Sequence, residues 1–153
     1  MSEMRSFDSW AAAELVFPPG TIAGGPTVAP AGAYLDMSDY DRVVFLIAIG
    51  ACAATDTLNA KLVQATTAAG AGSKDITGAV ITVLADADDN QFSTIELRAE
   101  ALDVAGGFRF VALSYTKAGA GTLVASVFAF RYRGGGLPPT KHASYNEAVE
   151  VLT

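Results

Sequence analysis

Hydrophobic and polar residues alternate along the middle of the chain with the period of two that is typical of β-strands. In LNAKLVQAT, residues 58–66, Asn59 and Lys61 fall on one face and apolar side chains fall on the other. FSTIELR, residues 92–98, alternates in the same way. RVVFLIAIG, residues 42–50, is instead apolar on both faces and rich in β-branched residues, so it predicts a strand that is buried on both sides.

The strongest hairpin signal is the sequence AGAG at 118–121. It stands between two strand-like segments, FRFVALSYTK at 108–117 and TLVASVFAFRYR at 122–133. A short glycine-containing turn between such segments predicts that the two strands pair with each other.

Two segments do not fit a pure strand pattern. In DITGAVITVL, residues 75–84, apolar side chains recur at helical spacing and Asp75 is placed to cap a helix, yet Val, Ile and Thr also favour a strand. Both structures stay open, with a slight preference for a short helix or turn. AEALD, residues 99–103, predicts one helical turn that joins two strands.

Short strands, glycine-containing turns and few helices predict a mainly β protein, built as a β-sandwich with a jelly roll as one candidate form. We assign the sandwich to residues 34–133. Residues 1–33 are predicted to be an extended N-terminal arm, because proline and glycine interrupt FPPGTIAGGPTVAPAGA. This arm carries apolar side chains such as Trp10, so we expect it to lie against its own domain or a neighbouring subunit.

Residues 134–153 are predicted to be a hinge followed by a C-terminal arm. GGGLPPT, residues 134–140, joins flexible glycines to a stiff Pro-Pro step. SYNEAVEVLT, residues 144–153, has apolar residues that suit docking as a strand or short helix on another surface. A frayed terminus is the alternative.

Composition favours burial between subunits. The chain has 153 residues, enough for one domain with a substantial core, and 51% of them are hydrophobic while only 17% are charged. It is therefore more apolar than a typical soluble monomer of this size. The uncharged run at 43–54 is too short to cross a membrane, and MSEMRSFDSW lacks the basic and apolar regions of a secretory signal. We expect a soluble, non-secreted protein without membrane contact.

Charge is unevenly distributed along the chain. Residues 1–103 hold 14 acids and 5 bases, whereas residues 104–153 hold 2 acids and 5 bases, so a net charge of −6 divides into −9 and +3. The bases of the second part are Arg109, Lys117, Arg131, Arg133 and Lys141. They predict either a surface that meets an acidic partner or late strands that pack beside acidic early ones. An acidic chain without a dense basic stripe is a poor nucleic-acid binder.

The segment ATTAAGAGSKD, residues 65–75, superficially resembles a phosphate-binding loop. Such a loop needs two glycines five positions apart, followed by Lys and then Ser or Thr, because the hydroxyl holds Mg²⁺. Here Asp75 follows Lys74 in the place of that hydroxyl. We therefore predict a surface turn, in which Gly70 and Gly72 supply backbone freedom and Lys74 keeps the tip soluble.

The acidic segment DADDN, residues 86–90, has the first three ligand positions of a calcium loop in Asp86, Asp88 and Asn90. Gln91 stands where the loop needs glycine, and Leu97 stands where it needs the bidentate glutamate. The pattern favours an acidic turn ahead of a strand.

Other candidate chemistry is sparse. One cysteine and one histidine exclude an internal disulfide framework and the usual clustered metal sites. Cys52 lies in an apolar stretch and is predicted to be a buried thiol, and His142 follows the Gly/Pro hinge and is predicted to be a solvated tail residue.

Two further groupings contain residue types that occur in functional sites. The acids Glu96, Glu100 and Asp103 imply no pocket for acid–base chemistry. The aromatic residues Phe128, Phe130 and Tyr132 recur at every second position, and we predict that they form one buried face instead of a sugar-binding platform. We therefore predict no catalytic, cofactor-binding or metal-binding residues, and a protein that is not an enzyme.

Several segments resemble a family of small structural proteins of tailed phages and prophages that are encoded near the major capsid gene. The resemblance covers roughly residues 34–133 and is carried by DMSDYDRVVF (36–45), AKLVQATTAAGAGSKDITG (60–78), DDNQ (88–91) and IELRAEALDVAGGFRFVAL (95–113). It implies a virion protein, most plausibly a head decoration or cement protein that binds the major capsid protein. It also implies a homotrimer, made in the bacterial cytoplasm and carried in the phage head. A head–tail joining or tail component and a β-sandwich ligand-binding module are the alternatives.

Overall fold

The computed structural model describes residues 11–29, 34–132 and 145–151, and for residues 25–29, 82–83 and 145–151 it gives the course of the backbone. Its strands are β1 (Ala11–Thr21), β2 (Gly25–Ala29), β3 (Leu35–Asp36), β4 (Arg42–Cys52), β5 (Thr57–Ala65), β6 (Lys74–Leu84), β7 (Phe92–Arg98), β8 (Phe110–Ala118), β9 (Leu123–Tyr132) and β10 (Tyr145–Val151). Three short 3-10 turns lie between them, η2 (Asp86–Asp88), η3 (Ala99–Ala101) and η4 (Val104–Gly106). No helix in the described ranges is long and apolar enough to span a membrane.

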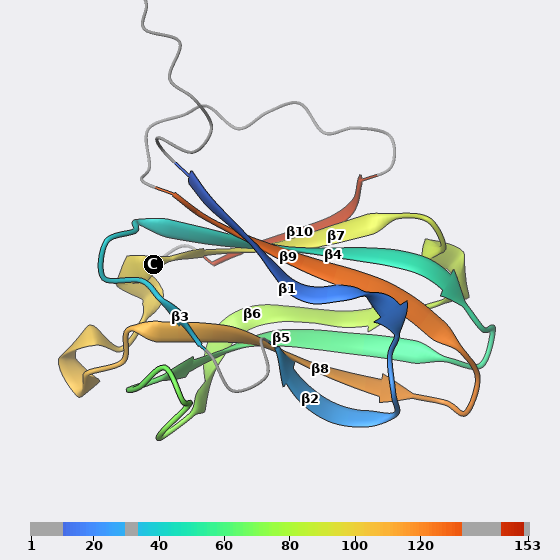
Figure 1. The fold of residues 1–153 in the computed structure, drawn as a ribbon, viewed down its shortest axis with the longest axis horizontal. Helices are drawn as coiled ribbons and strands as arrows, with labels where there is room; N and C mark the ends of the chain where they lie inside the picture. The colour runs from blue at the N-terminus through green and yellow to red at the C-terminus, as the bar shows by residue number, and fades with distance from the viewer. Residues whose placement is uncertain (1–10, 30–33, 133–144, 152–153) are drawn as a thin grey trace, which may run out of the picture.

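The strands form two sheets that pack face to face (Figure 1). Sheet 1 has the order β1-β9-β4-β7-β10, and sheet 2 has the order β2-β8-β5-β6, with β3 also paired to β8. Without β3 and β10, this is the strand order of an eight-stranded jelly roll, in which two Greek keys alternate between the sheets. Every described pairing is antiparallel except that of β10 with β7. The predicted mainly β sandwich is confirmed.

The core lies between the two sheets, because alternate residues of each strand point inward. β4 runs through sheet 1 and buries Val43, Phe45 and Ile47 completely on its inner face. Its outer face is only half-buried, whereas the sequence predicted burial on both sides for 42–50. The largest fully buried side chains come from both sheets and are Phe45, Ile47, Leu58, Leu62, Ile81, Leu84, Ile95, Leu97, Leu113 and Leu123. Each contributes about 1.5–3 kcal/mol by leaving water.

The alternating segments are confirmed as strands. In β5, Leu58 and Leu62 are buried while Asn59 is exposed. β7 spans the predicted residues 92–98. The predicted helical turn within 99–103 is also confirmed, because η3 forms a single turn there.

The slight preference for a helix at 75–84 is wrong, because these residues belong to strand β6. The pairing of β6 with β5 shifts between Lys61↔Val80 and Val63↔Asp75, and Gly78 lies within this bulge at φ 82°. The bulge sets inward-facing residues three apart and then two apart, at Ile76, Ala79 and Ile81. Val80, one of the residues at helical spacing, is 43% exposed, so that spacing did not mark a buried face, and the strand preference of the β-branched residues agrees with the observed bulged strand.

The hairpin predicted around 118–121 is also wrong. β8 pairs within sheet 2, whereas β9 pairs with β1 and β4 in sheet 1, so the AGAG turn carries the chain from one sheet to the other. A tight glycine turn suits such an arch as well as a hairpin. Consecutive strands instead pair across the 65–75 turn, where β5 meets β6.

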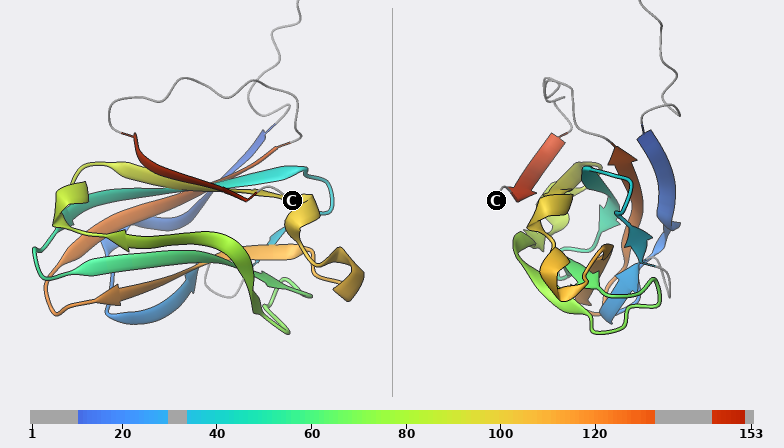
Figure 2. Two further views of the ribbon diagram at one scale, coloured as in Figure 1. Left: turned by 180° about the vertical axis from the view of Figure 1, so that it is seen from behind. Right: turned by 90° about the vertical axis from the view of Figure 1, so that its left-hand side faces the viewer.

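Both predicted arms contain strands of the sandwich. β1 pairs with β9 and β2 pairs with β8, which agrees with the expectation that the N-terminal segment lies against its own domain. β10 pairs with β7, so residues 145–151 dock as a strand at the margin of sheet 1 (Figure 2). The division of the chain at residues 33 and 133 stays a prediction. β1 and β2 precede the first boundary, β10 follows the second, and all three belong to the sheets.

Candidate functional site

The outer face of sheet 1 carries an apolar patch. The register places Leu15 of β1 beside Phe128 of β9, and Phe128 beside Leu46 of β4. Val44 lies two residues from Leu46 on the same face of β4. Leu15 is 54% exposed, and the other three side chains are half-buried. We call Leu15, Val44, Leu46 and Phe128 the apolar patch.

The aromatic residues of β9 do not form a buried face, so that prediction is wrong. Phe128, Phe130 and Tyr132 lie on the outer side of sheet 1 and are half-buried. The inward residues of the strand are Leu123, Ala125, Val127 and Ala129, all of them almost fully buried. Because both alternating sets are apolar, periodicity alone could not tell which set faces the core.

A bulge in β1 places Leu15 at the edge of the patch. The pairing with β9 shifts between Leu15 and Phe17, so both Val16 and Phe17 pack toward the core. Phe17 meets Tyr115 of sheet 2 edge to face, with 5.8 Å between the ring centroids. Leu15 therefore stays outside, next to Phe128.

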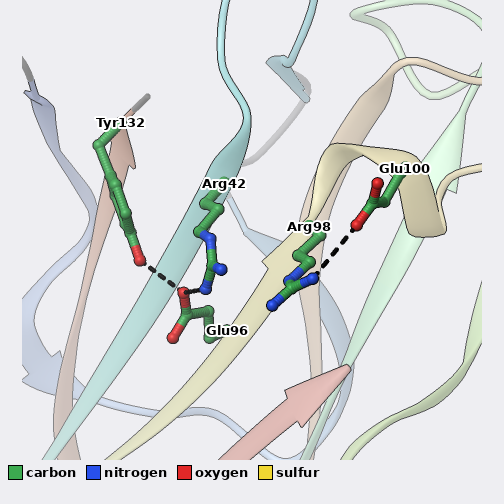
Figure 3. A network of polar contacts seen from close by, with 5 residues as sticks. All are labelled: Arg42, Glu96, Arg98, Glu100 and Tyr132. Carbon is green, nitrogen blue, oxygen red and sulfur yellow. Dashed lines mark hydrogen bonds and ion pairs between the residues drawn. The ribbon is translucent and has the colours of Figure 1, made fainter. Parts of the chain in front are cut away.

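A polar network borders the patch at one end of sheet 1 (Figure 3). Arg42 Nη1 donates a hydrogen bond to Glu96 Oε1 at 2.7 Å, and the Tyr132 hydroxyl donates to the same oxygen at 2.5 Å. Burial, together with the hydrogen bond to Glu96, raises the pKa of Tyr132 to about 12. The phenol therefore stays protonated at neutral pH and holds the carboxylate in place.

Arg98 and Glu100 continue this network. Arg98 Nη1 lies 3.4 Å from Glu100 Oε1, and an open cavity of about 260 Å³ is lined by Asp41, Arg42, Arg98, Ala99 and Glu100. Glu96 and Glu100 thus each face an arginine. Asp103 belongs to another cluster, beside Lys74. The three acids are not brought together as an acid–base site.

The outer face of sheet 2 is polar by contrast. Asn59 and Thr116 are paired and exposed, and Lys61 stands beside Ser114. Lys61 Nζ also forms an exposed ion pair with Asp75 Oδ2 at 2.7 Å. Val80 is an apolar residue on this face with 43% exposure, and toward one end of the sheet the register partners Val63 and Ala112 lie on the same face and are buried.

A buried ion pair, which the sequence analysis missed, closes the arch between β8 and β9. Lys117 Nζ lies 2.8 Å from Asp56 Oδ2 and donates to the Gly119 carbonyl, while the Gly121 amide donates to Asp56 Oδ1 at 2.8 Å. The two side chains are 3% and 0% exposed. The hydrogen bond from Lys117 lowers the pKa of Asp56. A Cβ at Gly119 would collide with Asp56 and the Thr55 carbonyl, and a Cβ at Gly121 would collide with Ala53, so the glycines of AGAG leave room for this carboxylate.

The segment 65–75 forms the surface turn between β5 and β6. Gly70 and Gly72 have φ of 85° and 66°, as the predicted backbone freedom requires. Gly70 lies directly under the Tyr34 ring, whose hydroxyl donates to Ser73 Oγ at 3.0 Å. Tyr34, which lies before β3, therefore packs against the turn at Gly70 and Ser73.

Lys74 lies at the start of β6 and not at the tip of the turn. Its Nζ is 2.5 Å from Asp103 Oδ2 and 4.0 Å from the centre of the Phe108 ring. The hydrogen bond from Lys74 lowers the pKa of Asp103, and the Asp103 side chain also accepts from the Gly106 amide. An open cavity of about 440 Å³ lies beside this pair, lined by residues of β6 and of 101–103.

The acidic turn is used for local hydrogen bonds. Asp88 Oδ2 accepts from the Ala85 amide, and Asp89 Oδ1 accepts from the Cys52 amide at 2.7 Å. In the described ranges no three acids, histidines or cysteines stand together to hold a metal ion. Cys52 is buried, as predicted, and burial raises the pKa of its thiol. His142 lies outside the described residues.

The basic residues of the second part of the chain face early acids. Arg109 pairs with Asp36 at 3.2 Å, and Arg131 pairs with Glu14 while its guanidinium stacks over Tyr40. Together with Lys117 and Asp56, these pairs support the interpretation that late strands pack beside acidic early ones. Arg133 and Lys141 lie outside the described residues.

No family model and no curated protein matches the chain. Among solved structures, a chain of infectious bursal disease virus, Gx strain, is similar over 84% of this protein and 33% of its own length, with TM-score 0.44 and 10% identity. This chain thus spans about a third of that viral chain. A Bacillus endospore appendage, from a family of disulfide-linked pili, is similar over 81% of this protein and 88% of its own length, with TM-score 0.40 and 14% identity. Similarity at this level concerns the fold alone.

Proposed function

We propose that the protein is a structural component of a tailed-phage head, which decorates the assembled major capsid lattice and stabilises it. Jelly rolls occur in viral capsid proteins but also in lectins and cupins, so the fold does not choose between these roles. The observation that carries the proposal is the polarity of the sandwich. The outer face of sheet 1 carries the apolar patch across β1, β9 and β4, whereas the exposed part of the outer face of sheet 2 is polar at Asn59, Lys61 and Thr116.

The apolar patch is the surface proposed to contact the capsid. Its four side chains come from three adjacent strands, so they form one continuous, shallow area on a sheet that the core holds rigid. The bordering Arg42, Glu96 and Tyr132 supply the polar rim that protein interfaces commonly have. Contact with the capsid lattice would bury the apolar patch without a rearrangement of the fold.

Stabilisation would follow from mass action. A protein that binds the assembled shell but not its loosened form stabilises the shell by an amount set by free concentration over the dissociation constant. Many copies on one lattice multiply that amount. No chemistry is needed, and we propose a homotrimer without enzymatic activity, made in the bacterial cytoplasm and carried in the virion.

The first test is the copy number in purified virions, measured by quantitative mass spectrometry against the major capsid protein. A ratio near one to one, or a simple fraction of it, is expected for a lattice-wide decoration protein. About a dozen copies or fewer would assign the protein to the head–tail joint or the tail. Absence from virions would contradict a virion role and favour a ligand-binding module.

A matched pair of variants tests the surface itself. Leu15→Asp places a carboxylate in the apolar patch, and Val80→Asp places one at a similarly exposed apolar position on sheet 2. We expect Leu15→Asp to weaken co-sedimentation with capsids at least tenfold while Val80→Asp leaves it unchanged, because only the first carboxylate would be desolvated. Equal binding by both variants would remove the patch from the interface.

A further inference from the structure

The larger cavity of the molecule, about 440 Å³, lies where the first residues of β6 meet the segment 101–103. Three of its lining residues are buried, because Gln64, Ile76 and Leu102 are only 5–6% exposed. Two of these three are apolar and one is a side-chain amide. A concave site with an apolar part and a few convergent polar groups is the usual form of a small-molecule site.

Gln64 presents an amide whose orientation is fixed. Its Oε1 accepts a hydrogen bond from the Asp103 backbone amide at 2.8 Å. Only the oxygen of a side-chain amide accepts, so this bond also decides where Nε2 lies. Among the residues that the structure describes, Nε2 has no hydrogen-bond partner, although Gln64 is almost fully buried. Because Gln64 lines the cavity, these two N–H donors are left for a group inside it.

The rim of the cavity offers both donors and acceptors. Lys74 Nζ lies 2.5 Å from Asp103 Oδ2, and an ammonium has further N–H donors beyond that contact. Asp75 accepts at Oδ2 from Lys61, and its second oxygen is a further acceptor. The exposed Thr77 hydroxyl both donates and accepts. The two carboxylates are matched by two ammonium groups, so the rim has no net charge.

We propose that this cavity binds a small polyhydroxylated ligand, a single sugar unit. An anion would meet the carboxylates of Asp75 and Asp103, and a cation would meet Lys74. Hydroxyl groups donate and accept, so one ligand can serve the Gln64 donors and the carboxylate acceptors together. The apolar side chains of Ile76 and Leu102 suit the C–H groups of a sugar ring.

The cavity is separate from the surface proposed to contact the capsid. Its residues come from β5, β6 and 101–103, whereas the apolar patch is formed by β1, β4 and β9. The inference therefore does not rest on the proposed function. Because the cavity is open, it accommodates either a free sugar or the terminal sugar of a polysaccharide.

An NMR titration of the ¹⁵N-labelled protein tests the class of ligand. Glucose, galactose, mannose and N-acetylglucosamine are added separately at millimolar concentration, with sodium sulfate as the anion and putrescine as the cation. We expect at least one of the sugars to give saturable shifts of the amide signals of Thr77, Ala101 and Asp103. The absence of such shifts with every sugar would overturn the proposal, and so would an equal response to sulfate or putrescine.

A matched pair of glutamine variants tests the amide itself. Gln64→Glu keeps an oxygen for the Asp103 amide but loses the Nε2 donors, and its register partner Lys74 favours the ionised carboxylate. Affinity for the responding sugar should fall about tenfold or more. Gln91→Glu is the control, because Gln91 Nε2 donates to the Ala87 carbonyl in the acidic turn, and it should bind as wild type.

Circular dichroism checks the fold of Gln64→Glu. Thr77→Val repeats the test at an exposed rim position and should weaken sugar binding about threefold. Unchanged affinity in both variants would overturn the proposal.

The source of the sugar is tested with polysaccharides. Dextran is compared with glucose, and mannan with mannose, per sugar unit. Tighter binding of the polysaccharide would assign a chain end as the ligand, and equal binding would assign the free sugar. The copy number in virions does not depend on this cavity, so the two proposals fail separately.

Discussion

The two outer faces of the sandwich differ although their strands share one core. On sheet 1, Phe128, Leu46 and Leu15 stand side by side across three strands. On sheet 2 the corresponding positions hold Asn59, Thr116 and Lys61, which suit contact with water. A sheet that faces only solvent needs one apolar side per strand, and β5 follows that rule from Thr57 to Leu62. β4 and β9 carry apolar residues on both sides, with Leu46 and Phe128 on the outer side.

In a fold without an evident reaction site, the outer faces of the sheets are the surfaces that can meet a partner. Inner faces are alike because both serve the core, so they carry no information on partners. The outer faces are under no such constraint, and their contrast therefore points to what each one meets.

The largest expected effect on stability comes from the buried ion pair between Lys117 and Asp56, on which both sheets depend. Lys117→Met leaves the buried Asp56 carboxylate without its cation, and such a loss costs several kcal/mol, which should lower Tm by about 10 °C. Lys61→Met removes an exposed pair on sheet 2 and should change Tm by about 2 °C or less. Differential scanning calorimetry compares the two. An equal, small effect would mean that Asp56 is not buried in solution.

The same ion pair predicts an acid dependence. The folded-state pKa of Asp56 lies below its ordinary value near 3.8, so the stabilisation is present above that pH and is lost as pH falls through the folded-state pKa. Thermal scans should therefore show the wild-type advantage over Lys117→Met shrinking below about pH 4. An advantage that persists unchanged at pH 2 would contradict this assignment.

A second change makes sheet 1 resemble sheet 2. Replacing Leu46 and Phe128 with threonine keeps strand-favouring residues but removes most of the apolar patch. Capsid co-sedimentation should fall about 30-fold, equivalent to about 2 kcal/mol of lost contact. The control replaces Asn59 and Ser114 of sheet 2 with threonine and should bind as wild type. Loss of binding in the control would show that the contrast between faces is not what the capsid recognises.

A smaller effect compares two tyrosines. Tyr132→Phe removes the donor to Glu96 and should cost about 1 kcal/mol, whereas Tyr34→Phe removes an exposed bond to Ser73 and should cost less than about 0.5 kcal/mol. Because the pKa of Tyr132 is raised to about 12, its contribution is complete below pH 10 and is lost as pH rises through 12. Phenolate absorbance during an alkaline titration gives the pKa, and a value near 10 would contradict the bond.

The smallest effect is expected at the turn of sheet 2. Lys74→Ala removes a half-exposed pair with Asp103 and the contact with Phe108, and Tm should change by about 2 °C or less while assembly stays intact. Size-exclusion chromatography checks the assembly. Abolished assembly would place this turn in an interface and would contradict the assignment of contacts to sheet 1.

The strands themselves could be predicted because alternation is a local property. β5 and β7 were recognisable from single segments, and the missing calcium and phosphate ligands at Gln91, Leu97 and Asp75 were visible by inspection. The candidate surface was not predictable in the same way. In β9 the alternate sets Ala125, Val127 and Phe128, Phe130 are all apolar, so the sequence could not say which set lies outside.

Propensity and local spacing are enough to specify the mainly β composition, the buried Cys52 and the turn at 65–75. Tertiary structure alone decided that β8 and β9 join different sheets, that 75–84 is a bulged strand, and that Lys117 meets Asp56 across 61 positions of the chain. These three features depend on which distant segments of the chain pair. The free energy of pairing belongs to both segments together, so the sequence of one segment alone does not reveal its partner.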